Sequence, residues 1–343
     1  MCAKKKGAKR GFLTVIAVIL GLILACLLAA TYYVNHFLNQ INRVEQIPQE
    51  TLTHEEVEII LAETDPVEEE FTGVIMEPEE VTMPEEPAEV IETGDHVVNI
   101  LLIGQDRRPG QGRQRSDSMI LCTINKEEKT LTMTSFLRDI YVKFPEYNGN
   151  KYSNNRLNVP YVIGGMEMLN DCLKMNFGVD VDHNIEVDFS GFEKIVDVMG
   201  GVEIELTAKE ARNLGGGLKE GINHMTGIQA LEYSRLRKID GDFQRTNRQR
   251  NVLTALLNKS RNLSLTELVS LAETVFPMIT TDMSNSDIIG YIKDFFPILL
   301  DLQIITQSAP QDGEYYFAQI HGMSVIVPDL EKINARLRET IGS

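Results

Sequence analysis

The chain has 343 residues, of which 33 are Lys or Arg and 50 are Asp or Glu, giving a formal net charge of -17. This length allows one large domain or two ordinary ones. The four cysteines form no Cys-x-x-Cys pair and no cluster with histidine, which argues against a zinc or iron–sulfur site.

The N-terminus predicts a membrane anchor. A basic tail over residues 1–11, "KKKGAKR" at its centre, precedes the uncharged run "FLTVIAVILGLILACLLAATYYV" at 12–34. As a helix this run is long enough to cross a hydrocarbon core of about 30 Å. The positive-inside rule places the tail in the cytoplasm and the rest of the chain outside, as in a single-pass protein of the cell membrane. The alternatives are a cleaved signal peptide and a lipoprotein cleaved before Cys26, but the apolar run is long and no A-x-A site ends it.

The negative charge is concentrated in the segment that follows. Residues 45–95 hold eighteen acidic residues and no Lys or Arg, whereas residues 96–343 hold 27 basic and 32 acidic residues and are close to neutral. A segment rich in Glu and Pro buries too little apolar area to offset its chain entropy. We therefore expect residues 35–95 to form a disordered extracellular stalk, with at most a short helix at "THEEVEIILAE".

The remainder, 96–343, reads as strands mixed with helices. Strands are expected at "HVVNILLIG", "SMILCTIN", "TLTMTSFL", "NIEV" and "VEIEL", and a last pair at "QIITQ" and "YYFAQI". Helical spacing appears in "GGMEMLNDCLKMNFG", "RNVLTALLNK", "LTELVSLAETVF", "SDIIGYIKDFFPILL" and "DLEKINARLRETI". This mixture predicts a single α/β domain with a central mixed β-sheet covered by helices. Cys122 and Cys172 fall within such apolar segments and are expected to be buried, with a disulfide between them left open.

Basic residues gather in "LEYSRLRKIDGDFQRTNRQR", residues 231–250. If "RLRK" is extended, Arg235 and Arg237 point to one face, and Asp242 is then a candidate N-cap for the helix that follows. On that helix Arg245, Arg248 and Gln249 share a face. Arginines beside a helix N-terminus suit bidentate contact with a multiply charged anion such as pyrophosphate. The alternative is a solvated basic face with ordinary ion pairs.

Two further segments pair arginine with aspartate where strands are expected to end, and α/β sheets usually hold their ligands at such positions. The segment "GQDRRPGQGRQRSDS" supplies Asp106, Arg108, Arg115 and Asp117. The segment "SFLRDIYV" supplies Arg138 and Asp139.

Five blocks in unbroken order resemble the LytR-CpsA-Psr family of cell-envelope proteins: "NILLIGQDRR…RSDS", "SFLRDIYV", "RLNVPYVIGG", the 224–250 segment and "TTDMSNSDI". The resemblance covers about residues 96–343 and implies a transferase. Its expected reaction moves an anionic glycopolymer, of the teichoic acid or capsular polysaccharide class, from a polyprenyl-pyrophosphate carrier to peptidoglycan. It also implies Mg²⁺ at Asp106 and Asp117, and pyrophosphate held by Arg115, Arg138, Arg235 and Arg237, with Arg245, Arg248 and Gln249 nearby.

The chain departs from the family pattern at three positions. Ser118 replaces a threonine, Leu137 replaces a proline, and Arg156 stands where a lysine is common; Arg156 is still expected to contact the pyrophosphate. Carboxylates without Cys or His suit Mg²⁺, and the lack of a Walker loop agrees with a reaction that uses no nucleotide. Asp139 and Asp242 are candidates for the base that deprotonates the acceptor hydroxyl, or for groups that only orient an arginine.

Three other functions would use the same residues. A regulator could bind polyprenyl phosphate without catalysis, and a hydrolase could use water as the acceptor. Nucleic-acid binding is disfavoured by the near-neutral domain, its external location and the lack of aromatic residues among the arginines. A polyprenyl tail needs an apolar groove, for which the 288–300 segment "IIGYIKDFFPILL" is a candidate.

Overall fold

The computed structural model describes residues 34–44, 52–64, 73–107 and 111–342. The chain divides into Met1–Ile41, of which residues 34–38 are helical, and a compact unit from Asn42 to Ser343. The predicted basic tail and all but the last residue of the predicted span lie outside the described residues. No helix within the described ranges has the length and apolar character needed to cross a membrane.

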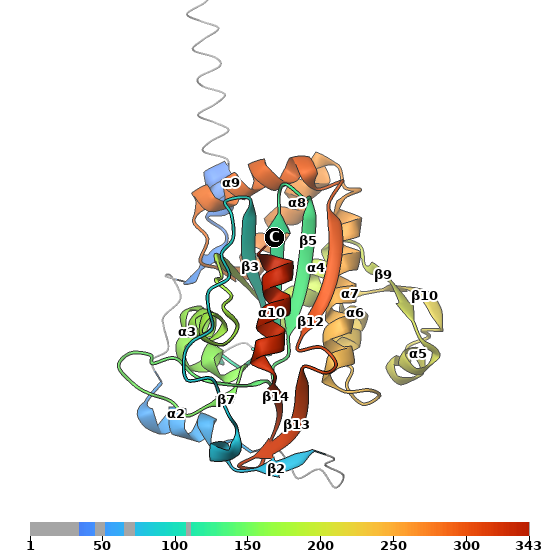
Figure 1. The fold of residues 1–343 in the computed structure, drawn as a ribbon. Coiled ribbons are helices and arrows are strands. Elements are labelled where there is room, and N and C mark those ends of the chain that lie inside the picture. The colour runs from blue at the N-terminus through green and yellow to red at the C-terminus, as the bar shows by residue number, and fades with distance from the viewer. Residues whose placement is uncertain (1–33, 45–51, 65–72, 108–110, 343) are drawn as a thin grey trace, which may run out of the picture. The chain divides into compact units, whose positions relative to one another are not determined.

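A seven-stranded mixed sheet forms the centre of the larger unit (Figure 1). Its order is β1-β11-β8-β3-β4-β5-β12. Strand β4 runs antiparallel to β3 and to β5, whereas β8 pairs parallel with β3 and β12 pairs parallel with β5. The strands span β1 (Asn42–Arg43), β3 (Val97–Gln105), β4 (Ser116–Asn125), β5 (Thr130–Phe136), β8 (His183–Asp188), β11 (Ile279–Thr281) and β12 (Gln303–Ala309). The predicted central mixed sheet is confirmed.

Side chains along each strand point alternately to the two faces of the sheet, so apolar residues lie on both faces, and helices cover both. Leu101 and Leu121 point to one face, where they pack with the helices α3 and α10. Ile100 and Ile120 point to the other, where α7 and α9 lie. The helices span α3 (Val159–Phe177), α4 (Phe189–Val198), α6 (Gly227–Arg235), α7 (Asp242–Ser260), α8 (Leu265–Val275), α9 (Asn285–Phe295) and α10 (Leu330–Ile341), with 3₁₀ turns η3 (Phe276–Met278) and η4 (Phe296–Ile298).

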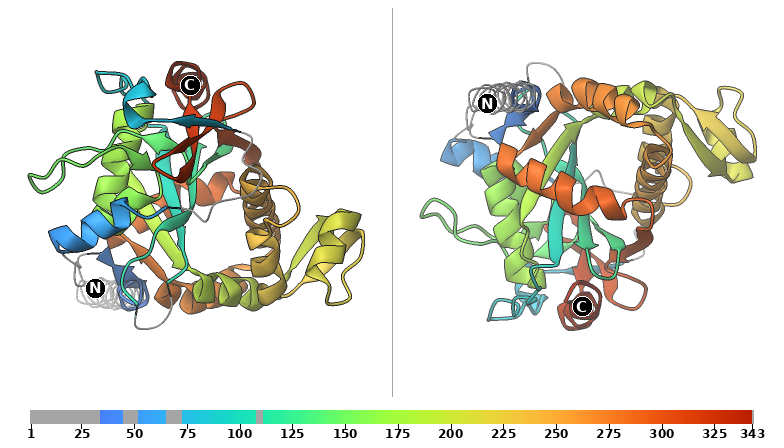
Figure 2. Two further views of the ribbon diagram at one scale, coloured as in Figure 1. Left: turned by 90° about the horizontal axis from the view of Figure 1, so that it is seen from below. Right: turned by 90° about the horizontal axis from the view of Figure 1, so that it is seen from above.

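Smaller elements surround this core. A hairpin of β9 (Val202–Leu206) and β10 (Gly221–Met225) carries α5 (Ala208–Leu214) and projects from the body of the domain (Figures 1 and 2). Strands β13 (Tyr315–Ile320) and β14 (Met323–Pro328) form a second sheet with β2 (Val74–Met76), and β6 (Tyr141–Val142) pairs with β7 (Asn155–Arg156). The expected pairing of "QIITQ" with "YYFAQI" is therefore wrong: the first joins β5 in the central sheet and the second joins β14.

The prediction of a disordered stalk is wrong for its described parts. Residues 52–64 contain helix α2 (His54–Leu61), where the sequence allowed a short helix, and residues 73–95 contain β2 and the 3₁₀ turn η2 (Pro78–Glu80), which were not expected. Val57, Val81 and Ile91 are buried in cores of the domain, and the backbone N–H of Ile91 donates to the carbonyl of Gly178 at 2.8 Å. The domain thus begins well before residue 96. A few apolar residues among the glutamates are enough to order this segment, because they pack against a domain surface that is already folded.

Both cysteines of this unit, Cys122 and Cys172, are buried and free, so no disulfide joins them. Burial raises the pKa of the Cys122 thiol to about 12, which keeps it protonated at neutral pH.

Candidate functional site

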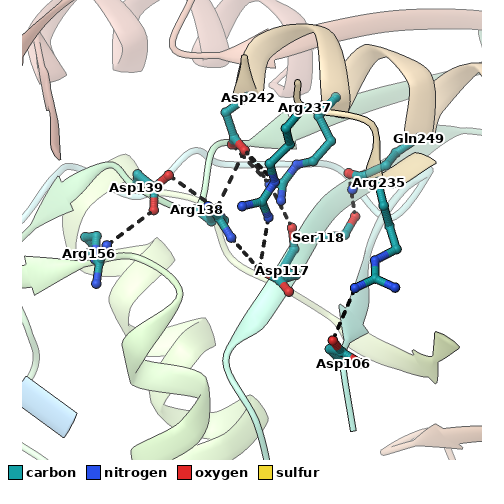
Figure 3. Close-up of polar contacts among 11 residues, drawn as sticks. Asp106, Asp117, Ser118, Arg138, Asp139, Arg156, Arg235, Arg237, Asp242 and Gln249 are labelled. Atoms are coloured by element: carbon teal, nitrogen blue, oxygen red, sulfur yellow. Dashed lines mark hydrogen bonds and ion pairs between the residues drawn. The ribbon is translucent and has the colours of Figure 1, made fainter. Parts of the chain in front are cut away.

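Most of the predicted site residues converge at one edge of the central sheet. Asp106 follows the last residue of β3, and Arg138 and Asp139 follow β5. Because β4 is antiparallel to both strands, its first residues Asp117 and Ser118 lie beside those strand ends. The end of α6 and the start of α7 complete the cluster (Figure 3).

Arg138 is the centre of the cluster. Its guanidinium lies 2.7 Å from a carboxylate oxygen of Asp117, 3.2 Å from Asp139 and 3.6 Å from Asp242 (Figure 3). Burial opposes its charged form, but the three carboxylates outweigh burial and hold the pKa of Arg138 above its usual value. Arg138 is therefore a fixed positive charge that is already balanced by protein carboxylates.

Arg245 is buried to 2% exposure beneath this cluster. It donates to the backbone carbonyl of Asp117 at 3.1 Å and to the carboxylate of Asp242 at 2.9–3.0 Å. Burial lowers the pKa of Arg245 to about 10, against the opposing effect of Asp242. The residue ties the first turn of α7 to the start of β4 and so fixes the cluster's geometry.

Arg235 and Arg237 are the solvent-exposed arginines of the cluster. Their side chains are 50% and 42% exposed, and both line a pocket. Arg235 lies 3.4 Å from Asp106, whereas Arg237 lies 3.7 Å from Asp117 (Figure 3). The guanidinium of Arg235 also stacks over the ring of Phe189 at 4.4 Å. Such long contacts leave both guanidinium groups able to take an anionic ligand.

The local backbone differs from the prediction at this point. Arg235 is the last residue of α6 rather than part of an extended segment, and extended backbone angles first appear at the C-cap, Leu236. Gly241, with φ of +86°, is the N-cap of α7, so Asp242 is the first helical residue. Glycine suits this position because its left-handed φ costs other residues strain. Gln249 of α7 accepts a hydrogen bond from the Ser118 hydroxyl at 3.0 Å.

Asp139 and Arg156 form the inner side of the cluster. Arg156 is 5% exposed and lies 4.0 Å from Asp139 (Figure 3). Burial raises the pKa of Asp139, although Arg138 acts in the opposite direction. Neither Asp139 nor Asp242 is among the pocket-lining residues in the described chain. Their contacts are with arginines, which favours an orienting role for both over that of a base.

Two predicted residues do not join the site. Arg248 instead donates to Glu210 at 2.7 Å, to the carbonyl of Leu236 at 2.7 Å and to Asp240. It therefore shares no functional face with Arg245. Arg115 lies 2.6 Å from Glu63 and donates to the carbonyl of Ile60, both in the predicted stalk. Arg108 lies outside the described residues.

The pocket has a volume of about 490 Å³, and its lining has a charged part and an apolar part. One end carries Asp117, Arg138, Arg235, Arg237 and Arg245. The rest is mainly apolar, with lining side chains from β3, β4, β8, α4, α6 and α7: Leu102, Ile103, Ile120, Ile185, Val187, Phe189, Phe192, Ile195, Leu231, Leu253 and Leu256. The 288–300 segment contributes no residue to this lining.

The carboxylate oxygens of Asp106 and Asp117 supply part of a site for a hard cation such as Mg²⁺. Asp106 and Asp117 are 34% and 28% exposed, and each carboxylate has lone pairs beyond those used by its arginine partners, one for Asp106 and two for Asp117. Mg²⁺ is commonly held by one or two carboxylates together with substrate phosphate oxygens and water. No group of three or more Asp, Glu, His or Cys side chains that could hold a metal occurs in the described ranges.

Sequence reasoning missed a buried network beside the site. Glu186 on β8 is 6% exposed and accepts hydrogen bonds from Gln105 and Tyr161, with Arg107 at 3.5 Å. Gln105 also accepts from the backbone N–H of Gln114 at 3.0 Å. The network therefore holds both ends of the segment between Asp106 and Asp117. The available signal in the sequence was Glu186, a charged residue between the apolar Ile185 and Val187 of an expected strand.

Comparison with known proteins agrees with this geometry. The LytR_cpsA_psr family model matches residues 69–337. MsrR of Staphylococcus aureus, named a regulatory protein, is 32% identical over 57% of this chain; the chain covers only 59% of MsrR. TagU of Bacillus licheniformis, named a polyisoprenyl-teichoic acid–peptidoglycan teichoic acid transferase, is 30% identical over 71% of this chain and 78% of its own.

A solved structure of TagT bound to LIIa-WTA superposes with a TM-score of 0.60 and 25% identity. The match covers 76% of this chain and 97% of the TagT chain. The family match begins inside the predicted stalk, in agreement with the ordered segment found there. The chain belongs to the LytR-CpsA-Psr family.

Proposed function

We propose that this protein is a phosphotransferase of cell-wall assembly. It moves an anionic glycopolymer, of the teichoic acid or capsular polysaccharide class, from a polyprenyl-pyrophosphate carrier to peptidoglycan. The protein would be anchored in the cell membrane by residues 12–34, with residues 42–343 outside the cell. The family membership and the names of TagU and TagT support a transferase.

One observation carries the proposal. A single pocket joins open arginines to an apolar chamber, which suits a ligand with a doubly charged anionic group at one end and a hydrocarbon at the other. Arg235 and Arg237 can exchange their long carboxylate contacts for phosphate oxygens, whereas Arg138 and Arg245 keep the cluster in place. Planar guanidinium groups hold such oxygens in pairs.

The chain's residues act by positioning and by neutralising charge. An acceptor hydroxyl attacks the phosphorus next to the glycopolymer, the bond from that phosphorus to the bridging oxygen breaks, and polyprenyl phosphate leaves with the hydroxyl proton, so negative charge grows on the phosphoryl oxygens during the step. Arg235, Arg237 and Arg138 face that charge, and Mg²⁺ held by Asp106 and Asp117 would neutralise more of it. Asp139 and Asp242 orient Arg138 and Arg245.

The test uses full-length protein in vesicles with a lipid-linked glycopolymer and isolated peptidoglycan. Arg237→Lys should weaken donor binding roughly ten- to a hundredfold, since Lys cannot reproduce the bidentate contact. Arg212→Lys, at an exposed position of α5, serves as the matched control. Unchanged binding and transfer by Arg237→Lys would refute the pyrophosphate site.

The name of MsrR favours a second candidate, a regulator that binds polyprenyl phosphate without transfer. The same pocket would serve it. Tight donor binding by the wild type, with neither polymer transfer to peptidoglycan nor release of phosphate, would support this candidate over the transferase and the hydrolase.

A further inference from the structure

Helix α9 has two apolar sides. Ile288, Tyr291 and Phe295 pack against the central sheet. Four exposed apolar side chains form what we call the outer α9 face: Ile289, Ile292, Phe296 and Leu300, exposed to 44%, 56%, 53% and 71%. Ile289 and Ile292 lie three residues apart on α9 and share a face of that helix, whereas Phe296 is the first residue of η4 and Leu300 lies in the turn that follows. A run of large exposed apolar side chains marks a contact surface for a partner or a membrane.

The chain enters the domain beside this helix. Asn42 of β1 pairs with Thr280 of β11, and its side-chain amide donates to the carbonyls of Pro277 at 3.0 Å and Ile279 at 3.1 Å. Arg43 donates to the side chain of Asn285, the first residue of α9, at 2.5 Å. The first ordered strand is thus fastened at the N-terminal end of α9.

This entry point limits the distance to the proposed membrane anchor. The predicted span ends at Val34, eight residues before Asn42, and residues 34–38 are helical. Helical residues rise about 1.5 Å each and extended ones about 3.5 Å, so the connection reaches about 20 Å at most. The N-terminal end of α9 must therefore lie near the bilayer surface if the anchor is as proposed.

The charges around α9 argue for apolar rather than electrostatic contact. Lys126 pairs with Asp294 at 3.1 Å, and Lys129 pairs with Asp301 at 2.9 Å. Lys293 is the only basic residue between 264 and 302, and basic clusters are what anionic lipids attract. Membrane contact through this face should therefore be insensitive to salt and to anionic lipid.

The same helix lies at the opposite end of the sheet from the arginines. Lys126 belongs to the turn between β4 and β5 and contacts α9, whereas Asp117 and Arg138 lie at the far ends of these two strands. Leu102, Ile120 and Leu253 line the pocket and belong to the apolar cluster beneath α9. The apolar part of the pocket is therefore continuous with the core under this helix.

We propose that the outer α9 face lies in the outer surface of the lipid bilayer, with α8 at the same end of the domain. Docked in this way, the domain turns the apolar side of its pocket toward the membrane and holds the arginine cluster away from it. This inference rests on the proposed function, because it assumes the anchor and assigns the direction from which a lipid-linked donor enters.

Tryptophan fluorescence gives a direct test, because the chain contains no tryptophan. Full-length Ile292→Trp is placed in zwitterionic vesicles whose acyl chains carry bromine, a quencher. Ile222→Trp, at a 74% exposed site on the projecting hairpin, is the matched control. We expect a short-wavelength, quenched emission from Ile292→Trp alone, unchanged at high salt. Absence of quenching, or equal quenching of both variants, would overturn the proposal.

A transfer assay separates this inference from the proposed function. The double variant Ile292→Asp and Phe296→Asp should transfer polymer from a long-chain donor in vesicles at least tenfold more slowly. Its rate with a short-chain, water-soluble donor should equal that of the wild type. Equal loss with both donors, or no loss, would count against docking. A wild type inactive on both donors would refute the proposed function, while the quenching result would still decide docking.

A second copy of the chain is the competing occupant of the outer α9 face. In that case Ile292→Trp would emit at short wavelength without bromine quenching, and the Asp variant would dissociate a dimer in detergent. That result would overturn membrane docking.

Discussion

The guanidinium of Arg115 lies 2.6 Å from the carboxylate of Glu63. It also donates to the carbonyl of Ile60, at the end of helix α2. The family resemblance implies that Arg115 contacts pyrophosphate. In this conformation Arg115 is instead paired with Glu63, and a ligand would have to displace that carboxylate. The ion pair thereby links the segment 52–64 to the residue directly before β4, the strand that carries Asp117 and Ser118.

Glu63→Gln should release this contact and strengthen donor binding. The pair is 24% and 58% exposed, and exposed ion pairs contribute roughly 0 to 1 kcal/mol, so the gain should be no more than about fivefold. Titration of a polyprenyl pyrophosphate against the wild type, Glu63→Gln and the exposed control Glu55→Gln measures it. Weaker binding by Glu63→Gln would mean that Glu63 holds Arg115 in its productive position.

Asp106→Asn and Asp117→Asn should each abolish transfer if these carboxylates hold Mg²⁺ with the donor phosphates. Asp106 contacts only one arginine among the ion pairs found in the described chain, so its loss should leave the fold intact. Transfer is measured after chelation and again after Mg²⁺ is restored, with the exposed Asp312→Asn as the control. Full wild-type activity in excess chelator would exclude the metal.

Arg248→Lys should reduce stability and leave the donor affinity of the folded protein unchanged. The Arg248 side chain is 3% exposed and joins Glu210, Asp240 and the carbonyl of Leu236. Breaking a buried pair costs about 3 to 5 kcal/mol when one partner is removed, and Lys retains part of that. Denaturant unfolding and donor titration together separate the two effects. A large fall in affinity with unchanged stability would return Arg248 to the ligand site.

The pair His183–Asp282, separated by 3.6 Å, should give a pH-dependent stability. The hydrogen bond with Asp282 raises the pKa of His183 despite partial burial. Burial opposes ionisation of Asp282, but hydrogen bonds from His183 and Asn184 hold the pKa of that carboxyl below its usual value. The histidine contribution is therefore complete below about pH 6.5 and is lost as pH rises through the folded pKa.

His183→Gln should accordingly reduce the fall in the free energy of unfolding that the wild type shows as pH rises above about 6.5, by no more than about 1 kcal/mol. His224→Gln, in the exposed pair with Glu203, is the control. Parallel curves for the wild type and His183→Gln would contradict the assignment.

Sequence patterns predicted the fold correctly in segments that are buried along their whole length. The run 96–104 predicted a strand covered on both faces, and β3 lies mid-sheet between β4 and β8 with nearly every side chain buried. Asp106, Asp117 and Arg138 were expected together because strand ends meet at one edge, and the structure brings them there. Patterns of period two and 3.6 report such local environments well.

Spacing could not identify the partners of individual arginines. Arg245 and Arg248 are three residues apart on α7, yet one contacts Asp117 and the other contacts Glu210 of α5. Helix α7 has neighbours on several sides, and the order of residues does not reveal which neighbour a side chain meets. Likewise, Arg115 is held by Glu63, a residue in a segment whose composition suggested disorder.

The two-residue strand β1 determines how the domain would respond to a pulling force. It pairs only with β11, at the end of the sheet, and its side chains Asn42 and Arg43 are held by residues 277–285. With the chain anchored as proposed, tension between membrane and wall would load these few hydrogen bonds first. They would give way before β3, β4 and β5 separated, lengthening the tether while the arginine cluster stayed assembled.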